Sequence, residues 1–322
     1  MEQHHLRIIM KYQEISLDHV SYSGDRQAQL ELHSFLNLLN VINMQLSVTA
    51  MELEAHDELQ WILERTLDLA EKVKSGDTAV LYPNHIDQYC TSVLSELEKL
   101  KHHFGNPDFA KVVEDSAGLM QEFFGVLKVR SSELLAKILS PGKWEAHDLE
   151  SYKEEFLSFF SAVEKNSRGR YRIIYNIARQ EELDYLVQLD IESEFGHVIY
   201  MPLSFKDVIR DLVANARKYT SPGGQIDIGI YQDRSMLRFS VKDSGMGIPA
   251  EEMERVFEFG YRASNVVGKP TMGGGFGLTK AAYVTKQLGG RIFLASEEGV
   301  GTRIRIEIPI PKQVNHQIET NV

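Results

Sequence analysis

The spacing of hydrophobic residues changes once along this chain, near Tyr171. Before that point apolar residues recur every three or four positions, which is typical of paired helices. Beyond it come strand-like runs such as YLVQLDI (residues 185–191) and runs that alternate apolar and polar residues. The chain has 322 residues, which is more than one hydrophobic core usually serves. The sequence therefore predicts a helical N-terminal half and a separate C-terminal domain of mixed helices and strands.

Residues 1–80 predict a helical hairpin. Two apolar stripes are separated by the polar break EAHDE (residues 54–58), and the second stripe ends near SGD (residues 75–77). The first stripe is Leu32, Phe35, Leu39, Ile42, Leu46 and Leu53, with Thr49 at one seam position, and the second is Leu59, Ile62, Leu63, Leu69 and Val73. Two copies of such a hairpin form a four-helix bundle. We therefore expect a homodimer through these helices.

Residues 81–175 are also helical in pattern, with Pro83, Pro107 and Pro141 as breaks. They contain no chemical motif. The region could extend the bundle, form an extra helical domain or provide a docking surface, and the pattern does not choose between these. At the other end of the chain, residues 313–322 predict a flexible tail.

Residues 176–312 predict a two-layer α/β sandwich. A helix over residues 202–219 has Ser204 as a plausible N-cap, and a second helix over residues 277–288 stops at two glycines. Alternating strands lie between the helices and after them. The inward faces of the alternating strands are Ile226, Ile228 and Ile230, then Leu237, Phe239 and Val241, then Ile304, Ile306, Ile308 and Ile310. Strands on one side and helices on the other give two layers.

The composition excludes several classes of protein. The net charge is -11, so nucleic acid is a poor default partner. Cys90 is the only cysteine, which excludes a disulfide framework and a cysteine-built metal site within one chain. The sequence contains no apolar run of membrane-spanning length and no secretory signal. These features predict a cytoplasmic protein without a membrane segment in this chain.

The stretch DSGMGIP (residues 243–249) suggests a ligand site. Asp243 continues the parity of Val241, so its carboxylate points toward the core side of the sheet. A buried carboxylate needs a partner, and none is adjacent in sequence. The exocyclic amine of adenine would suit it, and Gly245 and Gly247 would let the loop pass close to the ring.

The preceding helix presents a second group of polar side chains. Asp211, Asn215 and Lys218 lie at i, i+4 and i+7 and share one face. A carboxylate and an amide oxygen suit Mg²⁺, and a lysine suits phosphate. The alternative for Lys218 is a surface lysine that favours the dipole at the helix end.

The sequence GGGFGL (residues 273–278) leads directly into a helix. Glycines before a helix N-terminus aim backbone N–H groups at an anion. The segment before them, residues 257–272, has few strong propensities and carries Arg262 and Lys269. It predicts a mobile lid over phosphates, although both cations could be ordinary solvated loop charges.

These motifs together resemble the ATP-binding domain of sensor histidine kinases, within the superfamily of Hsp90-like and MutL-like ATPases. DLVANARKY is similar to the N box, DSGMGI and GGGFGLTKA to the two glycine boxes, VFEFGYR to the F box and GVGTRIRIEIP to the closing strand motif. The resemblance covers residues 183–311. Asp211 departs from it, because many kinases have asparagine there. The resemblance implies that Asn215 holds Mg²⁺, Asp243 reads adenine and Lys218 touches phosphate, while Gly273, Gly275 and Gly277 line the lid and phosphate side.

The first helix carries a partial match to the kinases' H box. In LELHSFLNLLNVI, His33 lies beside the apolar stripe and Asn37 one turn later on the same face. The resemblance implies that His33 is the phosphoacceptor. It also implies that Asn37 orients the water that hydrolyses the phosphorylated regulator. Ser34 stands where the family usually has an acid, and Leu38 replaces the usual proline.

Three functions follow from these observations. The first is a soluble, dimeric histidine kinase that binds Mg-ATP, phosphorylates its own histidine and transfers phosphate to, or removes it from, a response-regulator aspartate. The second is a nucleotide-binding docking regulator without transferase activity. The third is a serine kinase on the same fold, similar to the mitochondrial dehydrogenase kinases. The sequence leaves open the input signal, the cognate regulator, the strength of the autokinase and whether phosphorylation occurs in cis or in trans.

Overall fold

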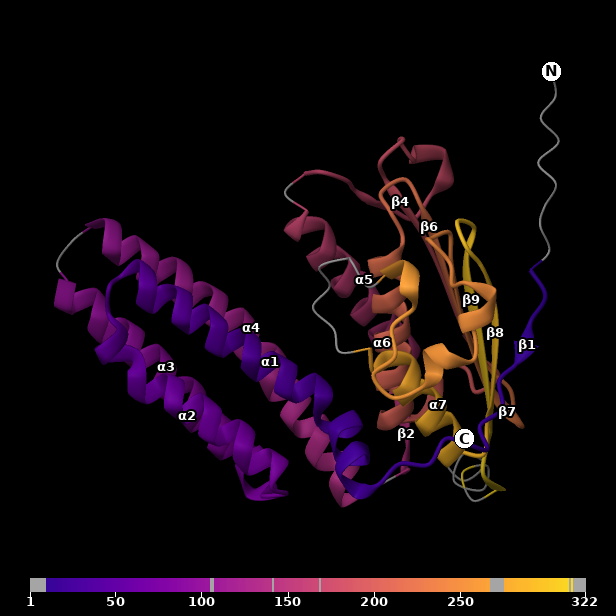
Figure 1. Ribbon diagram of the computed structural model, residues 1–322, viewed down its shortest axis with the longest axis horizontal. Helices are drawn as coiled ribbons and strands as arrows, with labels where there is room; N and C mark the ends of the chain where they lie inside the picture. Colours follow the sequence, from indigo (N-terminus) through magenta and orange to yellow (C-terminus); the bar gives the residue numbers. More distant parts are fainter. Residues whose placement is uncertain are drawn as a thin grey trace. The chain divides into compact units, whose positions relative to one another are not determined.

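The computed structural model describes residues 10–104, 107–140, 142–167, 169–266, 275–312 and 314, except the side chains of residues 25, 103, 104 and 166. The chain divides into two compact units (Figure 1). One, which we call the bundle unit, is Tyr22–Pro141. The other, which we call the sheet unit, combines Met1–Ser21 with Gly142–Val322. In sequence, the bundle unit is therefore inserted near the beginning of the sheet unit.

The bundle unit consists of four helices that lie side by side (Figure 1). They are α1 (Gly24–Glu52), α2 (His56–Lys74), α3 (Pro83–Phe104) and α4 (Pro107–Leu139), with the short 3-10 helix η1 (Thr78–Leu81) between α2 and α3. Helix α1 packs on both α2 and α4, and α3 packs on α4. The four-helix bundle is therefore complete within one chain.

The two predicted apolar stripes are confirmed as core. Every residue of the first stripe is buried, and in the second only Leu63 is partly exposed. The seam position Thr49 is buried as well, and its hydroxyl lies 2.8 Å from the hydroxyl of Ser116 on α4. This polar contact joins α1 to the part of the chain whose role the sequence pattern left open.

The predicted boundaries at residues 80 and 175 differ from those of the structure. Helices α3 and α4 complete the bundle because α4 buries its own apolar stripe, which includes Met120, Phe124 and Leu127. The prediction instead built the bundle from two copies of one hairpin. Homodimerisation through the N-terminal helices remains a prediction, since the structure describes one chain.

The sheet unit is built on a seven-stranded sheet. Across the sheet the order is β1 (Gln13–Glu14), β8 (Arg291–Glu297), β9 (Gly301–Pro309), β7 (Met236–Asp243), β6 (Gln225–Gln232), β4 (Tyr185–Ser193) and β3 (Ile173–Ile174). The pairs β3–β4 and β4–β6 are parallel and the others antiparallel. Strands β2 (Trp144–Asp148) and β5 (Val198–Pro202) form a separate antiparallel pair.

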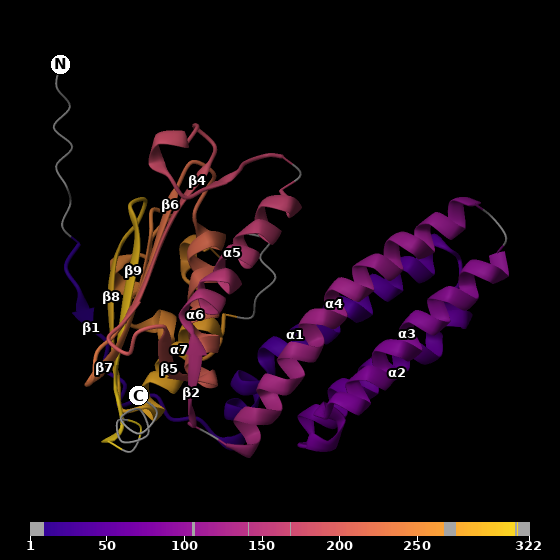
Figure 2. The same ribbon diagram turned by 180° about the vertical axis from the view of Figure 1, so that it is seen from behind.

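Helices α5 (Leu149–Asn166), α6 (Leu203–Tyr219) and α7 (Gly277–Gln287) lie together on one face of the sheet (Figure 2). The connections contain the 3-10 helices η2 (Ile177–Arg179), η3 (Ala250–Glu252), η4 (Arg255–Phe257) and η5 (Ser264–Val266). The predicted two-layer α/β sandwich is thus confirmed. The inward residues of β6, β7 and β9 are buried as the alternation predicted. Helix α6 begins after Pro202 without a side-chain cap, so the predicted N-cap at Ser204 is wrong.

Residues 10–21, which we call the strap, belong to the sheet unit although they precede the bundle. Strand β1 pairs with β8 at the sheet edge, and the Ile15 N–H donates to the Ile292 carbonyl at 3.0 Å. Ile15 and Val20 are buried. The Lys286 ammonium donates to the carbonyls of Asp18 and Val20, at 3.1 and 3.0 Å. The sheet unit therefore includes chain from both sides of the bundle.

The segment after β9 is described only in part. Ile310 and Val314 are buried in a small cluster with Trp144, Phe195 and Tyr200. Val314 was expected to belong to a flexible tail, and residues 315–322 lie outside the described residues. Within the described part of the chain, no helix has the length and apolarity needed to span a membrane.

Candidate functional site

Asp243 is the last residue of β7, and it lies between its strand partners Ile226 of β6 and Thr302 of β9. It is 8% exposed, and its Oδ1 accepts a hydrogen bond from the Gly245 N–H at 2.8 Å. Burial raises the pKa of the carboxyl group to about 6, against the opposing effect of the Gly245 and Thr302 N–H groups. None of the ion pairs in the described residues involves it. The predicted inward position is confirmed, and the carboxylate can still accept hydrogen bonds from a ligand.

The glycines after Asp243 are required by the protein's own backbone. A Cβ on Gly245 would lie 2.5 Å from the Tyr219 carbonyl oxygen at the end of α6. Gly247 has a φ of +68°, and a Cβ there would lie 2.0 Å from the Glu297 carbonyl oxygen. The Asp243 loop therefore passes close to the end of α6 at Gly245 and close to the end of β8 at Gly247. Close approach of a ligand ring, the predicted reason for both glycines, stays a prediction.

Asn215 faces the beginning of α7. A Cβ on Gly277 would lie 2.8 Å from Asn215 Nδ2, so a larger residue there would require the Asn215 side chain to shift. Helix α7 has no acidic residue in its first turn. Its N-terminus can therefore favour an anion beside the Asn215 amide. An amide oxygen at this place fits Mg²⁺, which takes oxygen ligands together with water and phosphate oxygens.

Asp211, predicted to share the metal with Asn215, is held by another residue. Its Oδ2 lies 2.9 Å from the ammonium of Lys280 on α7. Lys280 is buried, and sequence reasoning missed it. The available signal was a charged residue on the inner side of a helix in LTKAAYV. Asp211 therefore enters the site as one partner of an ion pair rather than as an open oxygen ligand.

Lys218 and Arg262 bring two positive charges to the same place. Burial, and secondly the Arg262 guanidinium, lower the pKa of the Lys218 ammonium. The ammonium also lies 5.2 Å from the centre of the Tyr219 ring. Burial and the Arg262 charge disfavour the charged form of Lys218, so a bound anion would stabilise that charged form. This arrangement supports the phosphate-binding role over that of a surface lysine.

The loop before α7 is fixed where it is described. Gly275 has a φ of +76°, and a Cβ there would lie 2.9 Å from the Tyr261 carbonyl oxygen. The Thr279 hydroxyl donates to the Glu258 carbonyl at 2.9 Å. The rings of Phe259 and Phe276 pack edge to face with centroids 4.9 Å apart. Gly273 and Lys269, two further predicted residues, lie outside the described residues.

The C-terminal part of the sheet unit matches a known family of nucleotide-binding domains. Residues 201–312 match the model of the histidine kinase-, DNA gyrase B-, and HSP90-like ATPases. These residues are an ATPase domain of that family. The match includes Asn215, Lys218, Asp243, Gly275 and Gly277, which the structure brings to α6, the β7 loop and the start of α7.

Curated relatives of the chain are sensor kinases. The aerobic respiration control sensor protein ArcB of Escherichia coli (strain K12) is 35% identical over 108 residues, which are 33% of this chain and 14% of ArcB. The sensor histidine kinase WalK of Bacillus subtilis (strain 168) is 26% identical over 189 residues, 57% of this chain and 29% of WalK. The chain thus spans less than a third of either relative. It is related to the sensor histidine kinases.

Solved histidine kinase domains are also similar to the chain. The nucleotide-free catalytic domain of the histidine kinase ThkA matches 52% of this chain and 95% of its own length, at 21% sequence identity and a TM-score of 0.38.

The predicted phosphoacceptor lies in the bundle unit, on α1. His33 is half-buried, Asn37 is exposed, and Asn37 Nδ2 lies 3.0 Å from His33 Nε2. When the amide donates, Nε2 is the acceptor and the imidazole hydrogen is on Nδ1. The predicted placement on one helix face is confirmed. Asn37 thus contacts the imidazole directly, and its predicted role in orienting a water molecule is separate from this contact.

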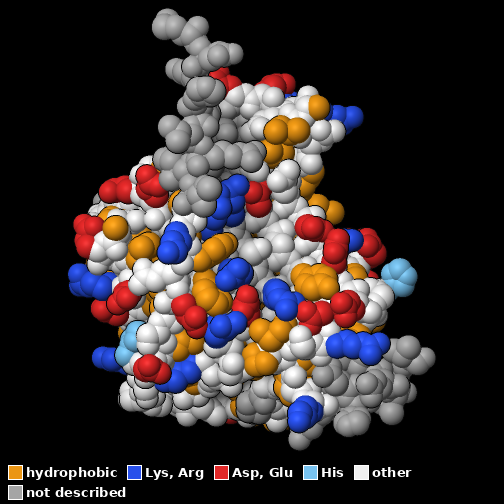
Figure 3. Space-filling view, turned by 90° about the vertical axis from the view of Figure 1, so that its right-hand side faces the viewer, with side chains coloured by type: hydrophobic (Ala, Val, Ile, Leu, Met, Phe, Trp, Pro, Cys, Tyr) orange, Lys and Arg blue, Asp and Glu red, His pale blue; other side chains and the backbone are white. Residues whose placement is uncertain are grey.

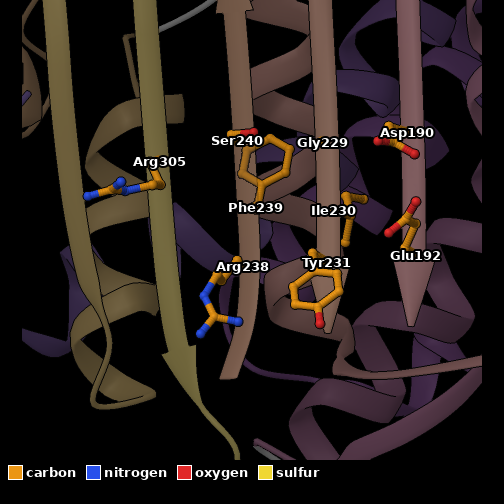
Figure 4. A pocket seen from close by; sticks show the side chains of 9 residues that line it. All are labelled: Asp190, Glu192, Gly229, Ile230, Tyr231, Arg238, Phe239, Ser240 and Arg305. Atoms are coloured by element: carbon orange, nitrogen blue, oxygen red, sulfur yellow. The ribbon is translucent and has the colours of Figure 1, made fainter. Parts of the chain in front are cut away.

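The sheet face opposite α5, α6 and α7 has a hollow unrelated to the ATPase motifs. The side that faces right in Figure 1 carries interspersed acidic, basic and apolar side chains (Figure 3). The hollow has a volume of about 250 Å³ and lies over β4, β6, β7 and β9 (Figure 4). It is lined by Asp190, Glu192, Gly229, Ile230, Tyr231, Arg238, Phe239, Ser240 and Arg305. Arg238 is paired with Asp233, and the Tyr231 hydroxyl donates to Glu194. Arg238 and Tyr231 thus already have partners within the protein.

Proposed function

We propose that the chain is a histidine kinase that binds Mg-ATP in its ATPase domain and phosphorylates His33. The observation that carries this proposal is the buried Asp243 carboxylate, which has only backbone donors among the described residues. A carboxylate in such a place is costly unless a ligand completes its hydrogen bonds. The adenine amine is the ligand group that suits it.

The remaining groups of the site suit the other end of the nucleotide. Lys218 and Arg262 would neutralise phosphate charge, and the α7 N-terminus would add backbone donors. Asn215 would hold Mg²⁺ through its amide oxygen. When bound, the metal would neutralise the charge that develops on the phosphate oxygens. Phosphoryl transfer needs mainly this neutralisation and correct positioning.

His33 would attack the γ-phosphorus through Nε2. The Nε2–P bond forms while the bond from phosphorus to the bridging oxygen of ADP breaks, and ADP leaves with the electron pair. The contact with Asn37 favours the tautomer with its lone pair on Nε2, which is the nucleophilic one. The amide must leave Nε2 before the attack, because both use the same lone pair.

The phosphohistidine would then pass its phosphate to an aspartate of a response regulator. The names of the related sensor kinases support a partner of this class. In this proposal the protein acts in the cytoplasm, where ATP is available, and as a homodimer. In a separate reaction, Asn37 would orient a water molecule that hydrolyses the aspartyl phosphate of the regulator and releases inorganic phosphate.

A serine kinase is the second candidate, and the bundle favours it in one respect. The four helices are completed within a single chain, so the bundle requires no second copy. The mitochondrial dehydrogenase kinases, named above as a possible similarity, also join a helical bundle to this ATPase domain. Such an enzyme would not use His33.

Labelling with γ-labelled ATP and Mg²⁺ separates these functions. The histidine kinase is expected to give acid-labile label on the full chain, absent from His33→Gln. His102→Gln is the matched control, because His102 is an exposed helical histidine paired with Glu98 and should keep the label. Acid-stable label on an added protein substrate would favour the serine kinase. ATP binding without any label would favour a docking regulator and would contradict both kinases.

A further inference from the structure

A cluster of four charged side chains joins α6 to α7. The Lys280 ammonium lies 2.9 Å from Asp211 Oδ2 and 3.5 Å from Asp207 Oδ2. Arg210 lies 3.2 Å from the other oxygen of Asp207. The side chains of Lys280 and Asp207 are 7% and 2% exposed, whereas that of Asp211 is 31% exposed. Of the two carboxylates, Asp211 is the one that reaches solvent.

Lys280 occupies an unfavourable place for a cation. It lies in the first turn of α7, where the helix dipole repels positive charge. A buried ammonium at such a position is tolerated only with close carboxylates. Asp207 is shared with Arg210, so Asp211 is the carboxylate that Lys280 has to itself within the described residues.

The same Asp211 stands beside the candidate metal ligand. Asp211 and Asn215 are one helical turn apart on α6, and both face Gly277. A carboxylate and an amide in this relation would form a pair of oxygen ligands for Mg²⁺. The Lys280 ammonium instead occupies Oδ2 at hydrogen-bond distance.

We propose that Lys280 is a positioning residue that keeps Asp211 out of metal coordination, so that Asn215 alone of this pair serves the metal. The inference rests on the proposed nucleotide function for its purpose. Because the Lys280 ammonium neutralises the Asp211 carboxylate, the affinity of the protein alone for the metal is low. The metal therefore enters together with the nucleotide phosphates. Lys280 would therefore make metal binding depend on nucleotide.

Titration of the full chain with Mn²⁺ tests this inference, with free Mn²⁺ followed by electron paramagnetic resonance and ADP present or absent. Lys280→Met leaves Asp211 without its cation, and we expect Mn²⁺ affinity in the absence of ADP to rise at least tenfold. In the double variant Lys280→Met/Asp211→Asn, the affinity should return to that of the parent. Asp211→Asn alone should change Mn²⁺ affinity in the presence of ADP by less than twofold.

Two results would overturn the inference. One is a folded Lys280→Met protein with unchanged Mn²⁺ affinity, and the other is a tenfold loss of Mn²⁺ affinity in Asp211→Asn with ADP. Should Lys280→Met fail to fold by circular dichroism, Asp211→Asn decides, because Lys280 keeps Asp207 as its partner there. Failure of the parent to bind ADP would contradict the proposed function instead, and the titration without ADP would still decide the role of Lys280.

Discussion

At Asp243, the stability of the fold and the binding of a ligand make opposite demands on one carboxyl group. Burial favours its neutral form and raises its pKa to about 6, from an ordinary value near 3.8. Between these two pH values the folded chain holds a proton that the unfolded chain has released. The contribution of Asp243 to stability is therefore greatest at low pH and declines as the pH rises through 6.

We expect Asp243→Asn to remove this pH dependence of the free energy of unfolding. Asparagine carries no charge, so the stability of the variant relative to the parent should rise by about 2 kcal/mol between pH 4.5 and 7.5, because the parent's pKa of about 6 lies roughly 1.5 pH units above pH 4.5. Urea unfolding of the nucleotide-free proteins across this range measures the difference. The variant should also lose ATP binding at pH 7.5, seen by calorimetry.

Asp184→Asn is the control for this experiment. A hydrogen bond from Arg172 lowers the pKa of Asp184 to about 2, so this group titrates below the chosen range. The difference between Asp184→Asn and the parent should stay constant from pH 4.5 to 7.5. An equally constant difference for Asp243→Asn would contradict the account of a buried, raised carboxyl group.

Single residues of the site could be predicted from sequence where the strand or helix period alone decides. Asp243 follows the parity of its strand, and Asn215 follows the polar face of its helix. The partner of Asp211 could not be found in this way, because Lys280 lies 69 residues away and meets it only after α6 and α7 pack. The close approach of Gly247 to the Glu297 carbonyl oxygen could not be predicted either, because it exists only in the folded sheet.

Among the elements, the strap is one that the sequence did not indicate. MKYQEISLDHV has no sustained period, and β1 contains only two residues. Its place depends on two buried side chains, on the edge of β8 and on the Lys286 ammonium, all contributed by distant sequence. Helix α1 shows the opposite case, because its long stripe at three-four spacing predicted a buried face by itself.

We expect Ile15→Ala to release the strap. Ile15 is buried, and removal of buried methyl groups of this kind costs roughly 2–4 kcal/mol. Because Ile15 supplies one of the two buried hydrophobic side chains of the strap, the backbone N–H groups of the strap should then exchange with solvent at least tenfold faster. Hydrogen exchange of a peptide covering residues 10–21 measures this. Glu14→Ala is the control, since Glu14 is exposed, and identical exchange in both variants would show that Ile15 does not hold the strap.

The whole molecule consists of two units with separate cores. The large core cluster of the bundle contains only residues between Leu32 and Leu135. The sequence predicted helices there, yet it could not tell whether residues 81–139 or a second chain would complete the bundle. Apolar stripes of similar spacing can pair within a chain or between chains, and only the packed helices distinguish these cases.

Separate cores imply separate unfolding transitions in calorimetry of the full chain. ADP with Mg²⁺ should raise only the unfolding temperature of the sheet unit. At an ADP concentration of one hundred times the dissociation constant, the stabilisation should be about 2.7 kcal/mol. Ile42→Ala, at a fully buried position of α1, should lower only the unfolding temperature of the bundle unit, since such a cavity costs about 2–5 kcal/mol. Met44→Ala on the same helix, where the side chain is 53% exposed, should change neither. A single transition that shifts as a whole with both ADP and Ile42→Ala would mean that the two units unfold as one, and the bundle would then report nucleotide binding directly.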